Sequence, residues 1–157
     1  HDDLDLGWRA SQLGVQSYYV PTSKIFHIES YSLQWSSKKF YWLERNRKYC
    51  LKTHYSKSTY KKLAFNFMLV DVLVFFFYLS KGFVGSKIKA DLDIRRNKKF
   101  IEEKYNELEN KKIISDEKLI NSFAEEIYLP ENVFGNVIYR AYNSILSYLS
   151  RNSKKFF

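Results

Sequence analysis

The chain has 157 residues, of which 45% are hydrophobic, and it carries a formal net charge of +9. This length and apolar content suffice for one domain with a core, which excludes a chain that is disordered throughout. The aromatic content of 18%, together with the basic charge, indicates an anionic partner, a membrane face or both.

The N-terminal region is predicted to begin with a helix and to continue with two strands. Residues 5–13 have an amphipathic pattern, and Gly14 follows where a helix commonly ends in a left-handed residue. The segments "VQSYYV" (15–20) and "SKIFHI" (23–28) are rich in β-branched and aromatic residues, and Pro21 separates them. These elements favour an α/β fold for the first third of the chain.

A polar segment and a basic helix are predicted next. Residues 30–37, "SYSLQWSS", are rich in serine and are expected to form a loop. Residues 38–55 repeat apolar or aromatic positions among many cations, which predicts an amphipathic helix with a basic face. The single cysteine of the chain, Cys50, falls in this helix, cannot form an internal disulfide and indicates a reducing compartment. No His/Cys group has zinc spacing.

Residues 63–79, "LAFNFMLVDVLVFFFYL", are apolar except for Asn66 and Asp71, and lysines lie on both sides. The segment is at the short limit of the roughly 17 to 25 residues that span a bilayer, and an aspartate near its middle opposes insertion. Three alternatives remain: a membrane span, a helix in the plane of the interface, and a buried core helix. We expect membrane contact of some kind.

The C-terminal half is predicted to be helical. Residues 95–112 form a charged helix with a narrow apolar stripe, and Ser115 followed by two acids is a good helix start. A last amphipathic helix is expected from near Glu131. The aspartates of "DLD" (91–93) are interpreted as solvated surface.

Three stretches near the N-terminus resemble the end of the catalytic domain in glycosyltransferase family 2: "DDLDLGWRASQLG", "SYYVP" and "KIFH". The later "FYWLERNR" and "IISDEKL" resemble segments that follow in many of these enzymes. The resemblance implies that residues 1–60 are the C-terminal part of a GT-A-like nucleotide-sugar transferase domain, of class α/β. Residues 61–157 would then be a mainly helical tail associated with a membrane.

The resemblance also implies roles for particular residues. Asp3, the second member of the acidic pair, would be the general base that takes the proton of the attacking acceptor hydroxyl, with Asp2 beside it. His27 would help to bind a divalent cation, Mg²⁺ or Mn²⁺, at the leaving diphosphate. Asp5, Trp8 and Arg9 would orient the acidic loop or lie on the acceptor side. Arg45 and Asn46 are secondary candidates for the site.

The function implied is that of an inverting transferase, which moves a hexosyl or rhamnosyl unit from a nucleotide-sugar donor to a lipid-linked or glycan acceptor. It would act at the cytoplasmic face of the cell membrane, as a peripheral or single-span protein. The chain begins with His1 and has almost nothing before Asp3, so we expect a fragment that lacks the donor-binding half and is inactive alone.

Other interpretations remain open. Without the resemblance, the three aspartates would be capping acids of a surface helix, and His27 would be a strand histidine. The chain would then be a non-catalytic, membrane-associated remnant or an interaction protein. A basic nucleic-acid-binding protein is a third hypothesis, but the cations are spread over several helices, and no nucleic acid is expected as partner.

Overall fold

The computed structural model describes residues 2–26, 36–124 and 136–157. Eight helices are found in these residues: α1 (Asp2–Gln12), α2 (Ser37–His54), α3 (Lys57–Lys62), α4 (Ala64–Ser80), α5 (Val84–Arg96), α6 (Lys98–Lys111), α7 (Asp116–Ser122) and α8 (Asn136–Lys154).

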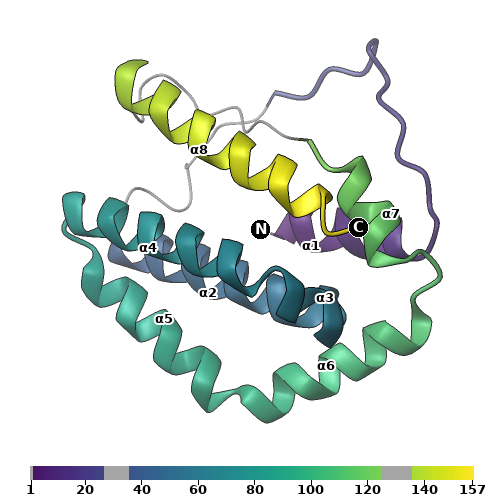
Figure 1. The fold of residues 1–157 in the computed structure, drawn as a ribbon, viewed down its shortest axis with the longest axis horizontal. Helices are drawn as coiled ribbons and strands as arrows, with labels where there is room; N and C mark the ends of the chain where they lie inside the picture. The colour runs from purple at the N-terminus through teal and green to yellow at the C-terminus, as the bar shows by residue number, and fades with distance from the viewer. Residues whose placement is uncertain (1, 27–35, 125–135) are drawn as a thin grey trace.

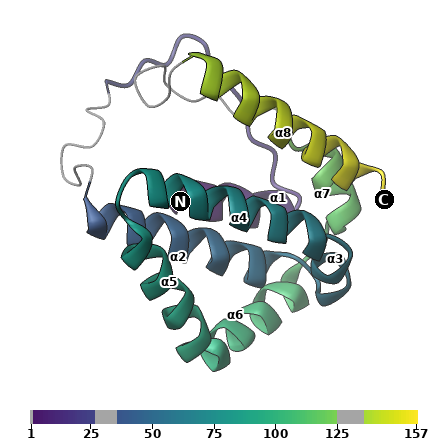
Figure 2. The same ribbon diagram turned by 60° about the vertical axis from the view of Figure 1, so that its left-hand side comes forward.

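The helix α2 is the centre of the fold. Figures 1 and 2 show α4 beside α2, the V-shaped pair α5 and α6 on one side, and α8 on the other. One core cluster contains Trp8 of α1, Cys50 of α2 and Leu119 of α7. At the other end of α2, Phe40 is fully buried and stacks on Phe83 with ring centroids 4.2 Å apart. The two ends of α2 therefore anchor different parts of the chain.

The prediction of an α/β fold is wrong for the described residues, which contain helices but no strand or sheet. Residues 15–20 and 23–26 have irregular backbone, and residues 27–28 lie outside the described residues. Tyr18, Tyr19 and Phe26 are 79% to 97% exposed. Strand propensity depends on packing against neighbouring strands, and this segment has none among the described residues.

Most of the predicted helices are confirmed, but the helix predicted at 95–112 is divided at Asn97 between α5 and α6. The segments 5–13, 38–55 and 63–79 correspond to α1, α2 and α4. Gly14, two residues after the end of α1, has φ +75°, and the Ser115 hydroxyl caps α7 by accepting a hydrogen bond from the Lys118 amide. The predicted loop at 30–37 and the start of the last helix near Glu131 fall largely outside the described residues.

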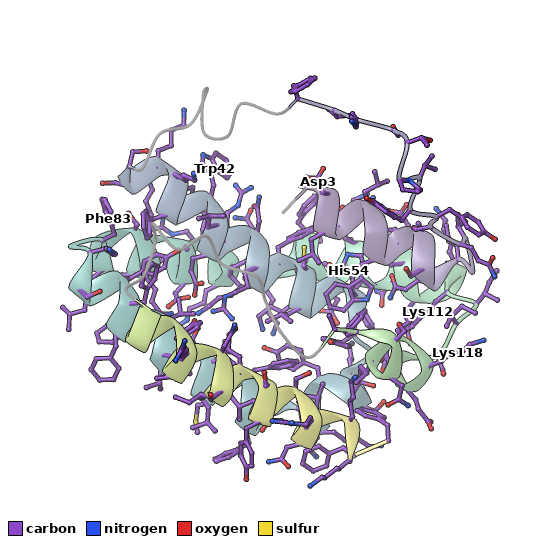
Figure 3. The ribbon with its side chains drawn as sticks, turned by 90° about the horizontal axis from the view of Figure 1, so that it is seen from above. Asp3, Trp42, His54, Phe83, Lys112 and Lys118 are labelled. Carbon is purple, nitrogen blue, oxygen red and sulfur yellow. The ribbon has the colours of Figure 1, made fainter. Side chains whose placement is uncertain are left out.

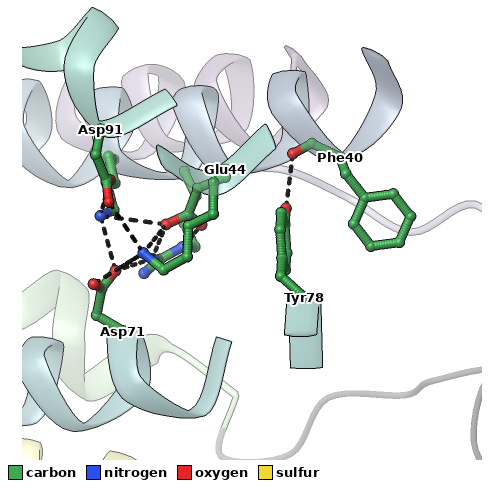
Figure 4. Close-up of polar contacts among 8 residues, drawn as sticks. Phe40, Glu44, Asp71, Tyr78 and Asp91 are labelled. Carbon is green, nitrogen blue, oxygen red and sulfur yellow. Dashed lines mark hydrogen bonds and ion pairs between the residues drawn. The ribbon is translucent and has the colours of Figure 1, made fainter. Parts of the chain in front are cut away.

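Six charged side chains fix α4 to α2 and α5. Glu44, Arg47 and Lys48 come from α2, Asp71 comes from α4, and Lys87 and Asp91 come from α5. We call this set the ion network (Figure 4). Arg47 contacts Asp71 at 2.8 Å, and Lys87 contacts Glu44 at 3.1 Å and Asp71 at 3.0 Å. Asp71 therefore faces the protein.

The interpretation of residues 91–93 as solvated surface is wrong for the two aspartates. Asp91 pairs with Lys48 and Lys87, and Asp93 accepts a hydrogen bond from the Tyr41 hydroxyl. Both carboxylates thus help to hold α5 against α2.

Among the helices of the described residues, we find none with the length and apolar character that crossing a membrane requires.

Candidate functional site

Trp8 attaches α1 to the rest of the molecule. Its ring is 7% exposed and stacks on the His54 ring, with centroids 4.8 Å apart and an interplanar angle of 12°. The rings of Tyr55 and Phe123 meet it edge-on, at 4.8 and 5.5 Å. Aromatic pairs in such arrangements add to the stabilisation from burial alone. The tryptophan of "DLGWR" is thus a packing residue that orients α1.

His54, the last residue of α2, is fully buried and joins α1 through both ring nitrogens. Its Nδ1 lies 2.9 Å from Oε1 of Gln12, and its Nε2 lies 2.7 Å from Oδ1 of Asp5. The Gln12 amide donates a 2.8 Å hydrogen bond to the His54 carbonyl. Burial lowers the pKa of His54, against the opposing effect of the Asp5 carboxylate. Figure 3 shows His54 against α1.

Asp5 links this buried cluster to the surface. Its carboxylate also pairs with Arg9, one helical turn later. Burial would raise the pKa of Asp5, but the hydrogen bonds from His54 and Arg9 outweigh burial and hold that pKa below its ordinary value. Asp5 is therefore an ionised carboxylate that both His54 and Arg9 engage.

Asp3 differs from Asp5 in being exposed and in forming no ion pair with another described residue. It lies in the first turn of α1, where a carboxylate interacts favourably with the helix dipole. Figure 3 shows it at the start of the helix. Asp2 belongs to the same turn. The side chain of Asp2 and the whole of His27 lie outside the described residues.

A cleft of about 360 Å³ opens beside Asp5, between α1, α2, α5 and α6. Its lining includes both secondary candidates, Arg45 and Asn46, together with Tyr49, Asn97 and Phe100. The Arg45 guanidinium lies 3.8 Å from the Trp42 ring centroid and donates to the Asn46 amide oxygen at 2.9 Å. Amide, guanidinium and aromatic groups of this kind can bind hydroxyl-rich ligands.

His27, the predicted ligand of Mg²⁺ or Mn²⁺, lies outside the described residues, and within them one group of side chains could hold a metal ion. Asp5, Cys50 and His54 offer ligand atoms within 4.8 Å of one another, but a thiolate and an imidazole suit softer metals than Mg²⁺. Asp5 is also held by Arg9, and the buried Trp8 Nε1, which has no hydrogen-bond partner in the structure, is a donor and not a ligand. The predicted cation therefore finds no oxygen-rich site in residues 2–26, 36–124 and 136–157.

The structure brings together only some of the predicted site residues. Asp5, Trp8 and Arg9 share α1, and Asp5 lines one cleft with Arg45 and Asn46. The most connected residue of the site, His54, is not among the residues predicted from the sequence. Its position four residues after Cys50 places both side chains on one face of the predicted helix 38–55. This spacing indicates that His54 and Cys50 are neighbours.

The comparisons with known protein families, curated proteins and solved structures find no match for this chain.

Proposed function

We propose that this chain is the acceptor-side part of an inverting glycosyltransferase, with Asp3 as the general base. The observation that carries the proposal is the contrast between two carboxylates of one helical turn. Asp5 is tied to His54 and Arg9, whereas Asp3 is exposed at the start of a helix that Trp8 holds in place. A carboxylate that is fixed in position and has no ion pair within the described part of the chain suits proton transfer.

In this proposal, the Asp3 carboxylate accepts the proton of an acceptor hydroxyl as that oxygen attacks the anomeric carbon of a nucleotide sugar. The bond from this carbon to the nucleoside diphosphate breaks, and the diphosphate leaves with the bonding electrons. The cleft lined by Arg45, Asn46 and Tyr49 binds the lipid-linked or glycan acceptor through its hydroxyl groups. The described residues are given no part in binding the donor, and no step is assigned to a metal in those residues. The reaction takes place at the cytoplasmic face of the cell membrane.

The test replaces Asp3 in the native protein. Asp3→Asn at the gene should lower transfer of labelled sugar from nucleotide sugars to membrane glycans by about 10² to 10⁴-fold, because the base is lost. The assay uses cell extracts with a panel of nucleotide sugars. Glu117→Gln is the matched control, since it removes an exposed carboxylate from the first turn of α7. An unchanged rate in Asp3→Asn would refute the base assignment.

A second candidate function is that of a non-catalytic interaction protein. The observation that favours it is the row of exposed hydrophobic side chains on α4, to which the transferase proposal assigns no role. If the wild-type extract transfers no sugar above the level of an extract without the protein, this second function replaces the first.

A further inference from the structure

The exposed surface of α4 is apolar along its length. Six large side chains of this helix are 38% to 64% exposed: Phe65, Met68, Val72, Phe75, Phe76 and Leu79. We call them the α4 stripe. Their spacing places them on one face of a helix about 25 Å long. Isolated exposed hydrophobic residues are ordinary, but a continuous apolar face marks an interaction surface.

Three polar side chains of α4 are bonded to other helices. Asn66 donates a 2.8 Å hydrogen bond to Ser153 of α8, and the Tyr78 hydroxyl donates a 2.7 Å bond to the Phe40 carbonyl. Asp71 belongs to the ion network (Figure 4). These bonds fix the rotation of α4, so the stripe is held toward the outside.

Exposed lysines stand at both ends of the stripe. Lys61 and Lys62 precede α4, Lys81 follows it, and none of the exposed residues of α4 is charged. Lysine stems can cover apolar surface while the ammonium groups reach a more polar layer. The same arrangement of an apolar face with terminal cations occurs in helices that bind anionic membrane surfaces.

We propose that the α4 stripe docks on an anionic lipid bilayer. The helix lies in the plane of the interface, its six apolar side chains enter the boundary with the acyl chains, and Lys61 and Lys81 contact lipid phosphates. Charge favours this partner over a second copy of the chain. A twofold contact through α4 would bring the lysines of two chains, each with net charge +9, toward one another. The docking does not depend on glycosyl transfer.

The test measures co-sedimentation with vesicles of phosphatidylcholine alone and with 30% phosphatidylglycerol. Phe65→Asn/Phe76→Asn should weaken binding to the anionic vesicles at least tenfold, because two side chains that enter the interface are removed. Both residues are exposed, so folding should be retained. Leu6→Asn/Ile113→Asn is the matched control, with exposures of 69% and 74% outside α4, and should bind as the wild type does.

A second pair of variants tests the charge. Lys61→Gln/Lys81→Gln should lose most of the preference for anionic vesicles, whereas Lys99→Gln/Lys118→Gln, exposed on α6 and α7, should keep it.

Equal binding of Phe65→Asn/Phe76→Asn and wild type would overturn the proposal, as would no wild-type binding to anionic vesicles. A dimer in sedimentation velocity that Phe65→Asn/Phe76→Asn abolishes would assign the stripe to self-association instead. Asp3→Asn should leave vesicle binding unchanged, which separates this proposal from the proposed enzymatic function.

Discussion

His54 shows how one residue can organise a site. It contributes a stacked ring to Trp8, a partner to the Asp5 carboxylate and a partner to the Gln12 amide, all from the end of α2. These contacts hold α1 in one orientation and so determine where Asp3 stands. At this scale the site depends on a buried polar cluster of His54, Asp5 and Gln12, beside which the Trp8 Nε1 has no hydrogen-bond partner in the structure.

Replacing His54 should test that cluster. His54→Phe keeps an aromatic ring against Trp8 but removes both hydrogen-bonding nitrogens, so we expect the free energy of unfolding to fall by about 1 to 3 kcal/mol. Urea denaturation measures the change. A double-mutant cycle with Asp5→Asn should give a coupling energy of about 0.5 to 3 kcal/mol. Strictly additive effects would mean that the Asp5 to His54 contact contributes nothing to stability.

The helices are held together by both apolar and ionic contacts. Glu44 of α2 is 1% exposed and contacts Arg47 and Lys87, while Asp71 ties α4 to the same cations. Buried charges of this kind are costly unless all of them are paired. The ion network therefore sets the position of α4 relative to α2 and α5, and with it the direction of the α4 stripe.

Breaking the network at its buried acid should be strongly destabilising. Glu44→Gln leaves three cations, Arg47, Lys48 and Lys87, with only two carboxylates, so we expect a loss of about 3 to 5 kcal/mol in the free energy of unfolding. Chemical denaturation followed by circular dichroism measures it. The matched control is Glu107→Gln in α6, whose carboxylate contacts two exposed lysines and should matter little. Similar losses for both variants would contradict the role given to the network.

The whole molecule has a large positive charge, and its folded state depends on ionised carboxylates. Burial alone would raise the pKa of Asp71, but hydrogen bonds from Lys48 and Lys87 lower that pKa from 3.8 to about 2. The unfolded chain therefore binds a proton at this position more readily than the folded one. The contribution of Asp71 to stability is complete above about pH 4 and is lost as the pH falls toward 2.

Acid unfolding should reveal this dependence. We expect the urea midpoint of the wild type to fall between pH 4 and pH 2, because Asp71 becomes protonated while the positive charge of the chain increases. Asp71→Asn should have a lower midpoint at pH 6 and a shallower decrease below pH 4. Glu117→Gln, which changes an exposed carboxylate in α7, should follow the wild type. Parallel curves for Asp71→Asn and wild type would rule out the assigned linkage.

The sequence by itself determined most of the helices and two of their ends. Periodic apolar residues predict α2, α4 and α6, and Gly14 and Ser115 mark helix boundaries through local backbone chemistry. The sequence also indicates that Asp5, Trp8 and Arg9 lie close together, because they fall within two turns of one helix. Signals of this kind act over a few residues and need no tertiary contact.

Only the tertiary structure decided whether strands form and which residues far apart in the sequence meet. Residues 15–20 have the composition of a strand, but a strand forms only where a neighbour can accept its hydrogen bonds, and none is present among the described residues. His54 pairs with Asp5, which is 49 positions away in the sequence. Asp71 points inward and pairs with Arg47, which is 24 positions away. Such contacts depend on how helices pack, so local periodicity does not encode them.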